Sequence, residues 1–187
     1  GAAENGAIVH YQPTEKTNRK LQENNLLLLD SGGQYFDGTT DVTRTVALGI
    51  PSAEMIHDFT LVLKGHIALE RAIFPKETSG VQLDALARLP LWREGKDYKH
   101  GTGHGVGCFG NVHEGPNRIS NKGSMYGFKA NMVTSIEPGY YKENAYGIRI
   151  ENLVYSKPSK KYENFLEFEI LTLVPIDKKL IDVYLLD

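Results

Sequence analysis

A glycine-rich stretch divides this chain and limits the folds that it can adopt. Glycines recur throughout residues 95–115. Each glycine inside a helix costs roughly 1 kcal/mol relative to alanine, so the stretch predicts a loop rather than a helix. The segments before and after it must therefore form the regular structure.

The remaining patterns predict short strands around two helices. Ser52 and Pro75 bound a run with helical spacing, and Ser79 with Gln82 predicts a capping box for a second helix that ends near Pro90. An Asp-Gly turn at Gly38 predicts a hairpin. The predicted strands cover residues 8–11, 26–30, 39–46, 132–136, 148–155 and 165–174, and the first two are expected to pair. This order predicts one α+β domain, residues 1–187, in which helices cover one face of a largely antiparallel sheet.

Composition excludes several classes of partner. The 21 Lys and Arg residues against 23 Asp and Glu residues leave a net charge of −2, which argues against nucleic acid and anionic membranes. The longest aliphatic run, residues 26–29, is far shorter than the roughly 18 residues of a membrane span. The single cysteine, Cys108, fits a reducing compartment, and we expect it to be a small packing residue.

Two carboxylates stand on opposite sides of the predicted hairpin. Asp30 ends one apolar run and Asp41 begins the facing strand, so a reversal near Gly38 could bring them together. Two buried carboxylates repel each other unless cations compensate them. The alternative is that Asp30 caps a turn while Asp41 faces solvent.

The segment His100-Gly-Thr-Gly-His104-Gly-Val-Gly places two histidines four residues apart. Its glycines exclude the zinc-binding helix that this spacing would otherwise indicate. They instead allow the backbone to pass close to a ligand. With His113 nearby, the segment predicts a site rather than structural histidines.

Two glutamates interrupt otherwise apolar strands. Glu137 precedes Pro-Gly, and Glu151 lies two residues after Arg149, on the same side of a strand. A plain salt bridge between Arg149 and Glu151 is one interpretation. Pairing of the strands would place Glu137 beside Glu151, and then a single arginine leaves a surplus negative charge. Asp30, Asp41, Glu137 and Glu151 carry four negative charges, which two divalent cations would neutralise, with His104 as a nitrogen donor.

Five blocks in this order carry a family resemblance. They are Asp30-Ser-Gly-Gly-Gln-Tyr with Asp37-Gly-Thr-Thr-Asp41-Val-Thr-Arg-Thr, His100-Gly-Thr-Gly-His104-Gly-Val-Gly, Val-His113-Glu-Gly-Pro, Glu137-Pro-Gly-Tyr-Tyr and Gly-Ile-Arg149-Ile-Glu151-Asn. Together they resemble Xaa-Pro aminopeptidase, or aminopeptidase P. Within the Glu137 block, Asn131 and Ser135 depart from the residues expected there.

The resemblance implies a pita-bread fold and two divalent metal ions, most often Mn²⁺, with Co²⁺ or Zn²⁺ possible. The residue matching Asp30 binds one metal, those matching Asp41 and Glu151 bridge both, and those matching His104 and Glu137 complete the second. His10, His100 and His113 would hold the substrate and assist catalysis, together with the catalytic Glu137. Tyr141 and Arg149 would support the centre and the substrate.

The implied reaction is hydrolysis of an N-terminal Xaa-Pro bond by a metal-bridging hydroxide, with Glu137 moving the proton. The expected substrates are peptides with proline in second position, and the expected setting is a cytoplasmic homodimer. We expect the chain to be a fragment of a longer eukaryotic enzyme, incomplete at its N-terminal side, that folds poorly and shows little activity alone. The alternatives are a prolidase, which accepts only dipeptides, and a non-catalytic peptide-binding module.

Overall fold

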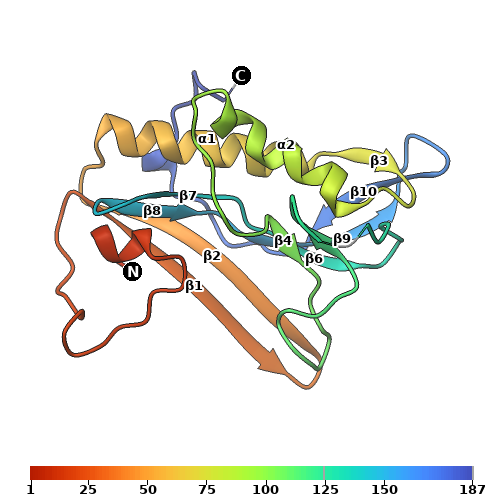
Figure 1. The fold of residues 1–187 in the computed structure, drawn as a ribbon, viewed down its shortest axis with the longest axis horizontal. Helices are drawn as coiled ribbons and strands as arrows, with labels where there is room; N and C mark the ends of the chain where they lie inside the picture. The colour runs from red at the N-terminus through yellow and green to blue at the C-terminus, as the bar shows by residue number, and fades with distance from the viewer. Residues whose placement is uncertain (124, 187) are drawn as a thin grey trace.

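The structure is a computed structural model that describes residues 1–123 and 125–186. Helices α1 and α2 lie next to each other along one side of the strands, and the long β1–β2 hairpin extends away from them (Figure 1). The elements are η1 (Ala3–Ala7), β1 (Asn25–Tyr35), β2 (Gly38–Leu48), α1 (Ala53–Glu70), β3 (Ile73–Pro75), α2 (Gly80–Trp92), β4 (Gly103–His104), β5 (Arg118–Ile119), β6 (Val133–Ile136), β7 (Gly139–Lys142), β8 (Tyr146–Arg149), β9 (Asn152–Pro158), β10 (Phe165–Ile170) and η2 (Lys178–Leu180).

Within residues 1–123 and 125–186, the strands pair in antiparallel ladders. The largest sheet has the order β3-β10-β9-β6, and β1-β2, β4-β5 and β7-β8 form two-stranded sheets. The α+β class with helices over antiparallel strands is thus confirmed.

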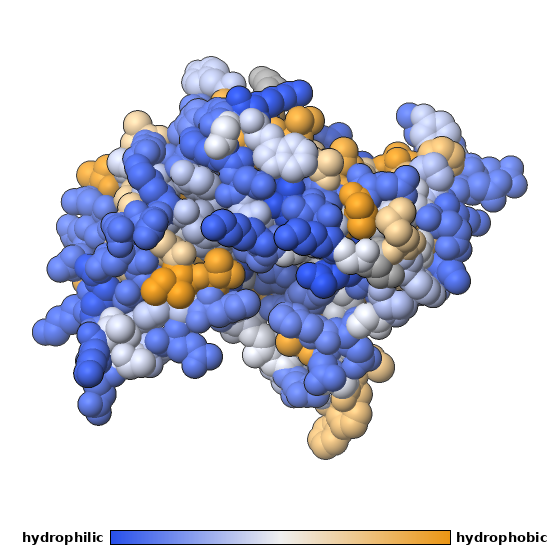
Figure 2. All heavy atoms as spheres, viewed as in Figure 1, coloured by the Kyte–Doolittle hydropathy of each residue, from blue (hydrophilic) through white to orange (hydrophobic). Residues whose placement is uncertain are grey.

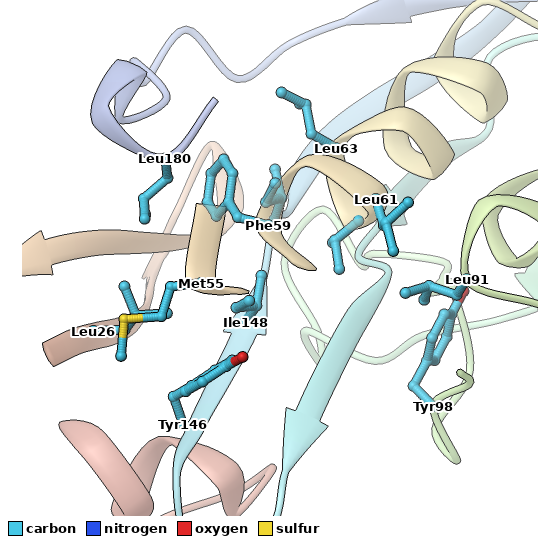
Figure 3. Close-up of a cluster of buried hydrophobic side chains, with 12 residues drawn as sticks. Leu26, Met55, Phe59, Leu61, Leu63, Leu91, Tyr98, Tyr146, Ile148 and Leu180 are labelled. Carbon is cyan, nitrogen blue, oxygen red and sulfur yellow. The ribbon is translucent and has the colours of Figure 1, made fainter. Parts of the chain in front are cut away.

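Two buried apolar clusters attach the helices to the strands. In the first cluster, Met55 and Phe59 of α1 lie near Leu26 of β1 and Ile148 of β8 (Figure 3). Leu61 lies on the side of Leu91 and Tyr98. The second cluster lies between α2 and the four-stranded sheet. The helices themselves pack closely, because a Cβ atom at Gly65 would lie only 2.0 Å from the Ala87 carbonyl oxygen.

Local sequence signals were confirmed where they depend on neighbouring residues. The chain reverses between Tyr35 and Gly38, as the Asp-Gly pair predicted. Ser52 caps α1 by accepting a hydrogen bond from the Met55 N–H at 3.2 Å. The capping box of Ser79 and Gln82 is present at the start of α2.

The strand predicted at residues 8–11 is wrong. This segment contains turns that follow η1, and it forms no ladder with β1. The ladder positions on β1 are taken instead by the first residues of the chain, since Ala2 bridges Leu27 and the Leu28 N–H donates to the Gly1 carbonyl at 2.9 Å.

Other elements begin or end at residues that differ from the predicted ones, because pairing between distant strands competed with the local sequence pattern. Helix α1 ends at Glu70, and the residues before Pro75 form β3, which pairs with β10. Helix α2 continues past Pro90 to Trp92, and β10 ends at Ile170, before the predicted end at residue 174. The strand predicted at residues 148–155 is divided into β8 and β9, which belong to different sheets.

The tip of the hairpin contacts the glycine-rich loop. The Gln34 side chain donates to the Gly110 carbonyl at 2.5 Å, and the exposed rings of Phe36 and Phe109 stack with centroids 5.7 Å apart. An apolar projection at the lower end of the molecule stands out from a mostly hydrophilic face (Figure 2). Cys108 in this loop is exposed, so the expectation that it packs internally is wrong.

Within the described ranges, no helix has both the length and the apolar character to cross a membrane.

Candidate metal centre

The β1–β2 hairpin brings Asp30 and Asp41 to one face. The register pairs Asp30 with Thr43 and Asp41 with Gly32, so the two carboxylates are diagonal neighbours. Only 11% of the Asp41 side chain is exposed, which contradicts the alternative that it faces solvent. The Asp30 side chain is 46% exposed and lies at the edge of the site.

Strand pairing also places the two glutamates side by side. Ile136 of β6 pairs with Asn152 of β9, so Glu137, just after the end of β6, is opposed to Glu151, just before the start of β9. Glu151 is buried, and the Thr43 hydroxyl donates to its Oε2 atom at 2.7 Å. Glu151 therefore joins the hairpin to the sheet.

His104 faces these carboxylates from β4. Its Nδ1–H donates to the Gly105 carbonyl at 3.0 Å, which leaves Nε2 directed toward the acids. The Nε2 atom lies 3.2 Å from Glu137 Oε1 and 3.6 Å from Asp41 Oδ2. The glycine before it is required, because a Cβ atom at Gly103 would lie 1.9 Å from the Ser135 carbonyl oxygen.

Three of these side chains have the geometry of metal ligands. Within the described part of the chain, one ligand atom each from Asp41, His104 and Glu151 lies within 4.8 Å of the others. Two oxygen donors and one imidazole nitrogen suit Mn²⁺, Fe²⁺, Co²⁺ or Zn²⁺. Asp30 and Glu137 border this group.

The charges of the group support a cation site. Burial, together with the charges of Glu137 and Asp41, raises the pKa of Glu151 to about 9. Burial and the charge of Asp30 raise the pKa of Asp41 to about 6. Burial opposes ionisation of Glu137 as well, but the hydrogen bond and charge of His104 outweigh it and lower the pKa of Glu137. The site carries more negative charge than its own cations balance, so the residues fit divalent metal ions.

Arg149 pairs with Asp30 rather than with Glu151. The buried guanidinium contacts Asp30 Oδ2 at 2.7 Å and donates to the Tyr141 hydroxyl at 2.8 Å. It lies 4.0 Å from Glu137 Oε2. Arg149 and Glu151 do face the same side, as predicted, since both reach the Thr43 hydroxyl.

The three other predicted histidines surround the acids. His100 donates from Nδ1 to the Gly101 carbonyl, and its Nε2 accepts from the Tyr141 hydroxyl at 2.9 Å. Burial lowers the pKa of His100. The His113 ring lies 4.2 Å from the His104 ring, and His10 is exposed. All four histidines line a cavity of about 490 Å³ together with Glu137.

Two polar residues in the site were not predicted. Thr43 bridges Arg149 and Glu151, and Ser135 receives the His104 N–H while its hydroxyl donates to Glu137 Oε1 at 3.2 Å. The one available signal for Ser135 was its position two residues before Glu137, on the same face of a strand. Thr43 likewise lies two residues from Asp41, on the same face of β2.

Comparison with known proteins defines the class. The model of metallopeptidase family M24 matches residues 1–158. The chain therefore belongs to metallopeptidase family M24. Its pita-bread fold, expected from the motifs, is confirmed by the solved structures of relatives.

Three relatives show the similarity in more detail. The chain is 50% identical over 187 residues to aminopeptidase P1 of Lotus japonicus, covering 97% of this chain and 28% of that protein. It is 49% identical to X-prolyl aminopeptidase from Caenorhabditis elegans, which is described as a cytosolic enzyme with a di-nuclear active site. The two structures match with a TM-score of 0.96 over 100% of this chain and 31% of that one. The prolidase from Pyrococcus furiosus is 28% identical with a TM-score of 0.79, over 93% of this chain and 48% of that one. The chain thus spans less than a third of the length of these two aminopeptidases.

Proposed function

We propose that the protein containing this chain is a metal-dependent aminopeptidase that hydrolyses the N-terminal Xaa-Pro bond of peptides. The observation that supports this most directly is the convergence of Asp41, His104 and Glu151 in a chain that is half identical to aminopeptidase P. The proposal includes residues 1–187 as a single metallopeptidase domain.

The metal ligands would be Asp30, Asp41, His104, Glu137 and Glu151, with two ions bound and Mn²⁺ as the native metal. The di-nuclear site of the Caenorhabditis elegans relative supports the number of ions. When bound, the ions supply Lewis-acid activation of water and of the scissile carbonyl.

The side chains around the ligands would bind substrate and move protons. Glu137 would accept the proton of the attacking water and pass it to the leaving nitrogen, because its lowered pKa keeps it ionised. His113 and His10, on the cavity wall, would donate hydrogen bonds to the developing oxyanion. His100 and Tyr141 would position the peptide, and Arg149 would hold Asp30 in place.

The peptide-length preference separates this function from its nearest rival. A prolidase accepts only Xaa-Pro dipeptides, and the similarity to the Pyrococcus furiosus prolidase extends over most of the chain. The 49% and 50% identities to aminopeptidases favour longer substrates. A non-catalytic peptide-binding module would not need an intact set of acidic residues.

The test uses the full-length protein with Mn²⁺. We expect hydrolysis of Xaa-Pro-Xaa peptides, and we expect Asp41→Ala to lose both activity and bound metal. Asp37→Ala is the matched control, since Asp37 lies in the exposed turn of the same hairpin and should leave both unchanged. Cleavage of dipeptides alone would indicate a prolidase, and metal binding without any cleavage would indicate the binding module.

The setting of the enzyme belongs to the same proposal. We propose a cytoplasmic location, supported by the cytosolic relative, and a homodimer of the full-length protein, supported by the family resemblance. Light scattering of the purified protein tests the dimer, and fractionation of the source cells tests the location.

A further inference from the structure

Arg44 lies behind the proposed metal ligands, on the other face of the hairpin. It follows Thr43 in β2, so its side chain points away from the face that carries Asp41. The residue is only 7% exposed. A buried guanidinium has to be compensated by hydrogen bonds or by opposite charge.

Every N–H group of this guanidinium has an acceptor. An arginine side chain offers five donors. Nη1 donates to the carbonyls of Glu151 at 2.5 Å and Thr43 at 2.8 Å, and Nη2 donates to Asn152 Oδ1 and the Val174 carbonyl, both at 2.7 Å. Nε donates to the Pro175 carbonyl at 3.1 Å. One side chain therefore joins β2, the start of β9 and the segment that follows β10.

The break between β8 and β9 explains why this contact matters. Glu151 stands between the two strands, and its N–H donates to the Thr43 carbonyl at 3.1 Å. Its carbonyl lies outside the strand ladders and receives Arg44 Nη1. Arg44 thus supplies the hydrogen-bond donor that a neighbouring strand would have supplied to the Glu151 carbonyl if the strand were continuous. It also donates to the Thr43 carbonyl, which accepts the Glu151 N–H.

The neighbouring amide is fixed from the opposite side. Asn152 Nδ2 donates to Glu70 Oε1 at 2.7 Å, which orients Oδ1 toward Arg44. Glu70 is in the last turn of α1 and also contacts the buried His66 at 3.0 Å. The hydrogen bonds therefore run from α1 through Asn152 and Arg44 to the backbone of Glu151.

We propose that Arg44 is a positioning residue that fixes the Glu151 carboxylate relative to Asp41 and thereby sets the affinity for metal. The inference rests on the proposed metal site. Lysine cannot replace the planar group of five donors, so Arg44→Lys should displace Glu151 while the positive charge remains. Loss of a group that orients a ligand typically weakens metal binding about 10–100-fold.

The experiment measures Mn²⁺ binding by calorimetry in the full-length protein. We expect Arg44→Lys to raise the Kd for Mn²⁺ about 10–100-fold relative to the unchanged protein. Arg88→Lys is the matched control, because Arg88 is fully buried and donates to the carbonyls of Tyr98 and His100, neither of which is a proposed ligand. The control should lower the melting temperature of the metal-free protein and leave the Kd unchanged.

Three results would overturn the inference. The first is an unchanged Kd in Arg44→Lys, and the second is an equal rise in Kd for both variants, which would indicate general loosening of the fold. If Arg44→Lys does not fold, Asn152→Ala is tested instead, because it removes one acceptor of the same guanidinium and should raise the Kd for Mn²⁺ about tenfold. The third result is an unchanged Kd in Asn152→Ala. A native protein that binds no Mn²⁺ would reject the proposed metal site along with the inference, whereas the first three results leave the site intact.

Discussion

Metal binding should release a proton from the site, because burial and its acidic neighbours keep Glu151 protonated when no cation is present. At pH 7, Glu151, with a pKa of about 9, is mostly protonated. Asp41, with a pKa of about 6, is mostly ionised at this pH. Metal ligation requires the ionised carboxylates, so binding should release at least about one proton per site at pH 7.

Calorimetry can count these protons. Mn²⁺ is titrated into the metal-free, full-length protein at pH 7 in buffers that differ in ionisation enthalpy, and the slope of the binding enthalpy gives the number released. The number should fall when the titration is repeated above pH 9, where Glu151 has already ionised. The apparent affinity should increase with pH up to about pH 9 for the same reason.

The control for this measurement is Asp37→Asn, which removes an exposed carboxylate from the same hairpin and should leave the proton count unchanged. Binding of Mn²⁺ at pH 7 with no proton release would refute the reasoning. It would mean that Glu151 is ionised in the metal-free site in spite of its burial and its acidic neighbours.

Two further predictions concern stability. The pKa of Glu151 in the folded chain is about 9, above the ordinary value of 4.5, so its contribution to stability is complete below pH 4.5 and is lost as the pH rises through 9. The melting temperature of the metal-free protein should therefore fall across this range, and saturating Mn²⁺ should remove the decline. Parallel curves of melting temperature against pH with and without metal would contradict the assignment. Ile148→Ala removes a fully buried side chain from the cluster in Figure 3 and should lower the free energy of unfolding by about 2–5 kcal/mol in denaturant titrations. A loss below about 1 kcal/mol would show that the cavity collapses, and metal affinity should not change in either case.

Much of the candidate site could be predicted from the sequence. Five ordered motifs identified the four acids and His104, and the structure brings these residues together although they are up to 121 residues apart, from Asp30 to Glu151. The contacts that hold them were not predictable. Arg44, Thr43 and Ser135 lie in the same motifs, but their roles depend on partners from other strands.

The differences between prediction and structure follow from the range of the interactions. Hairpin reversal at Gly38 and the caps at Ser52 and Ser79 depend on residues within three or four positions, so the sequence alone determined them. The apolar run at residues 148–155 is compatible with one strand or with two. Its division at Glu151 depends on Thr43 of β2, and the choice of Asp30 as the partner of Arg149 depends on β1, in both cases more than 100 residues earlier.

The sequence by itself determined which residues are available for chemistry and where the chain must turn, because backbone preferences and side-chain types are local properties. Only the tertiary structure decided how these groups meet. The pairing of distant strands, the burial that raises the pKa of Glu151 and the hydrogen bonds of Arg44 exist only after distant segments pack.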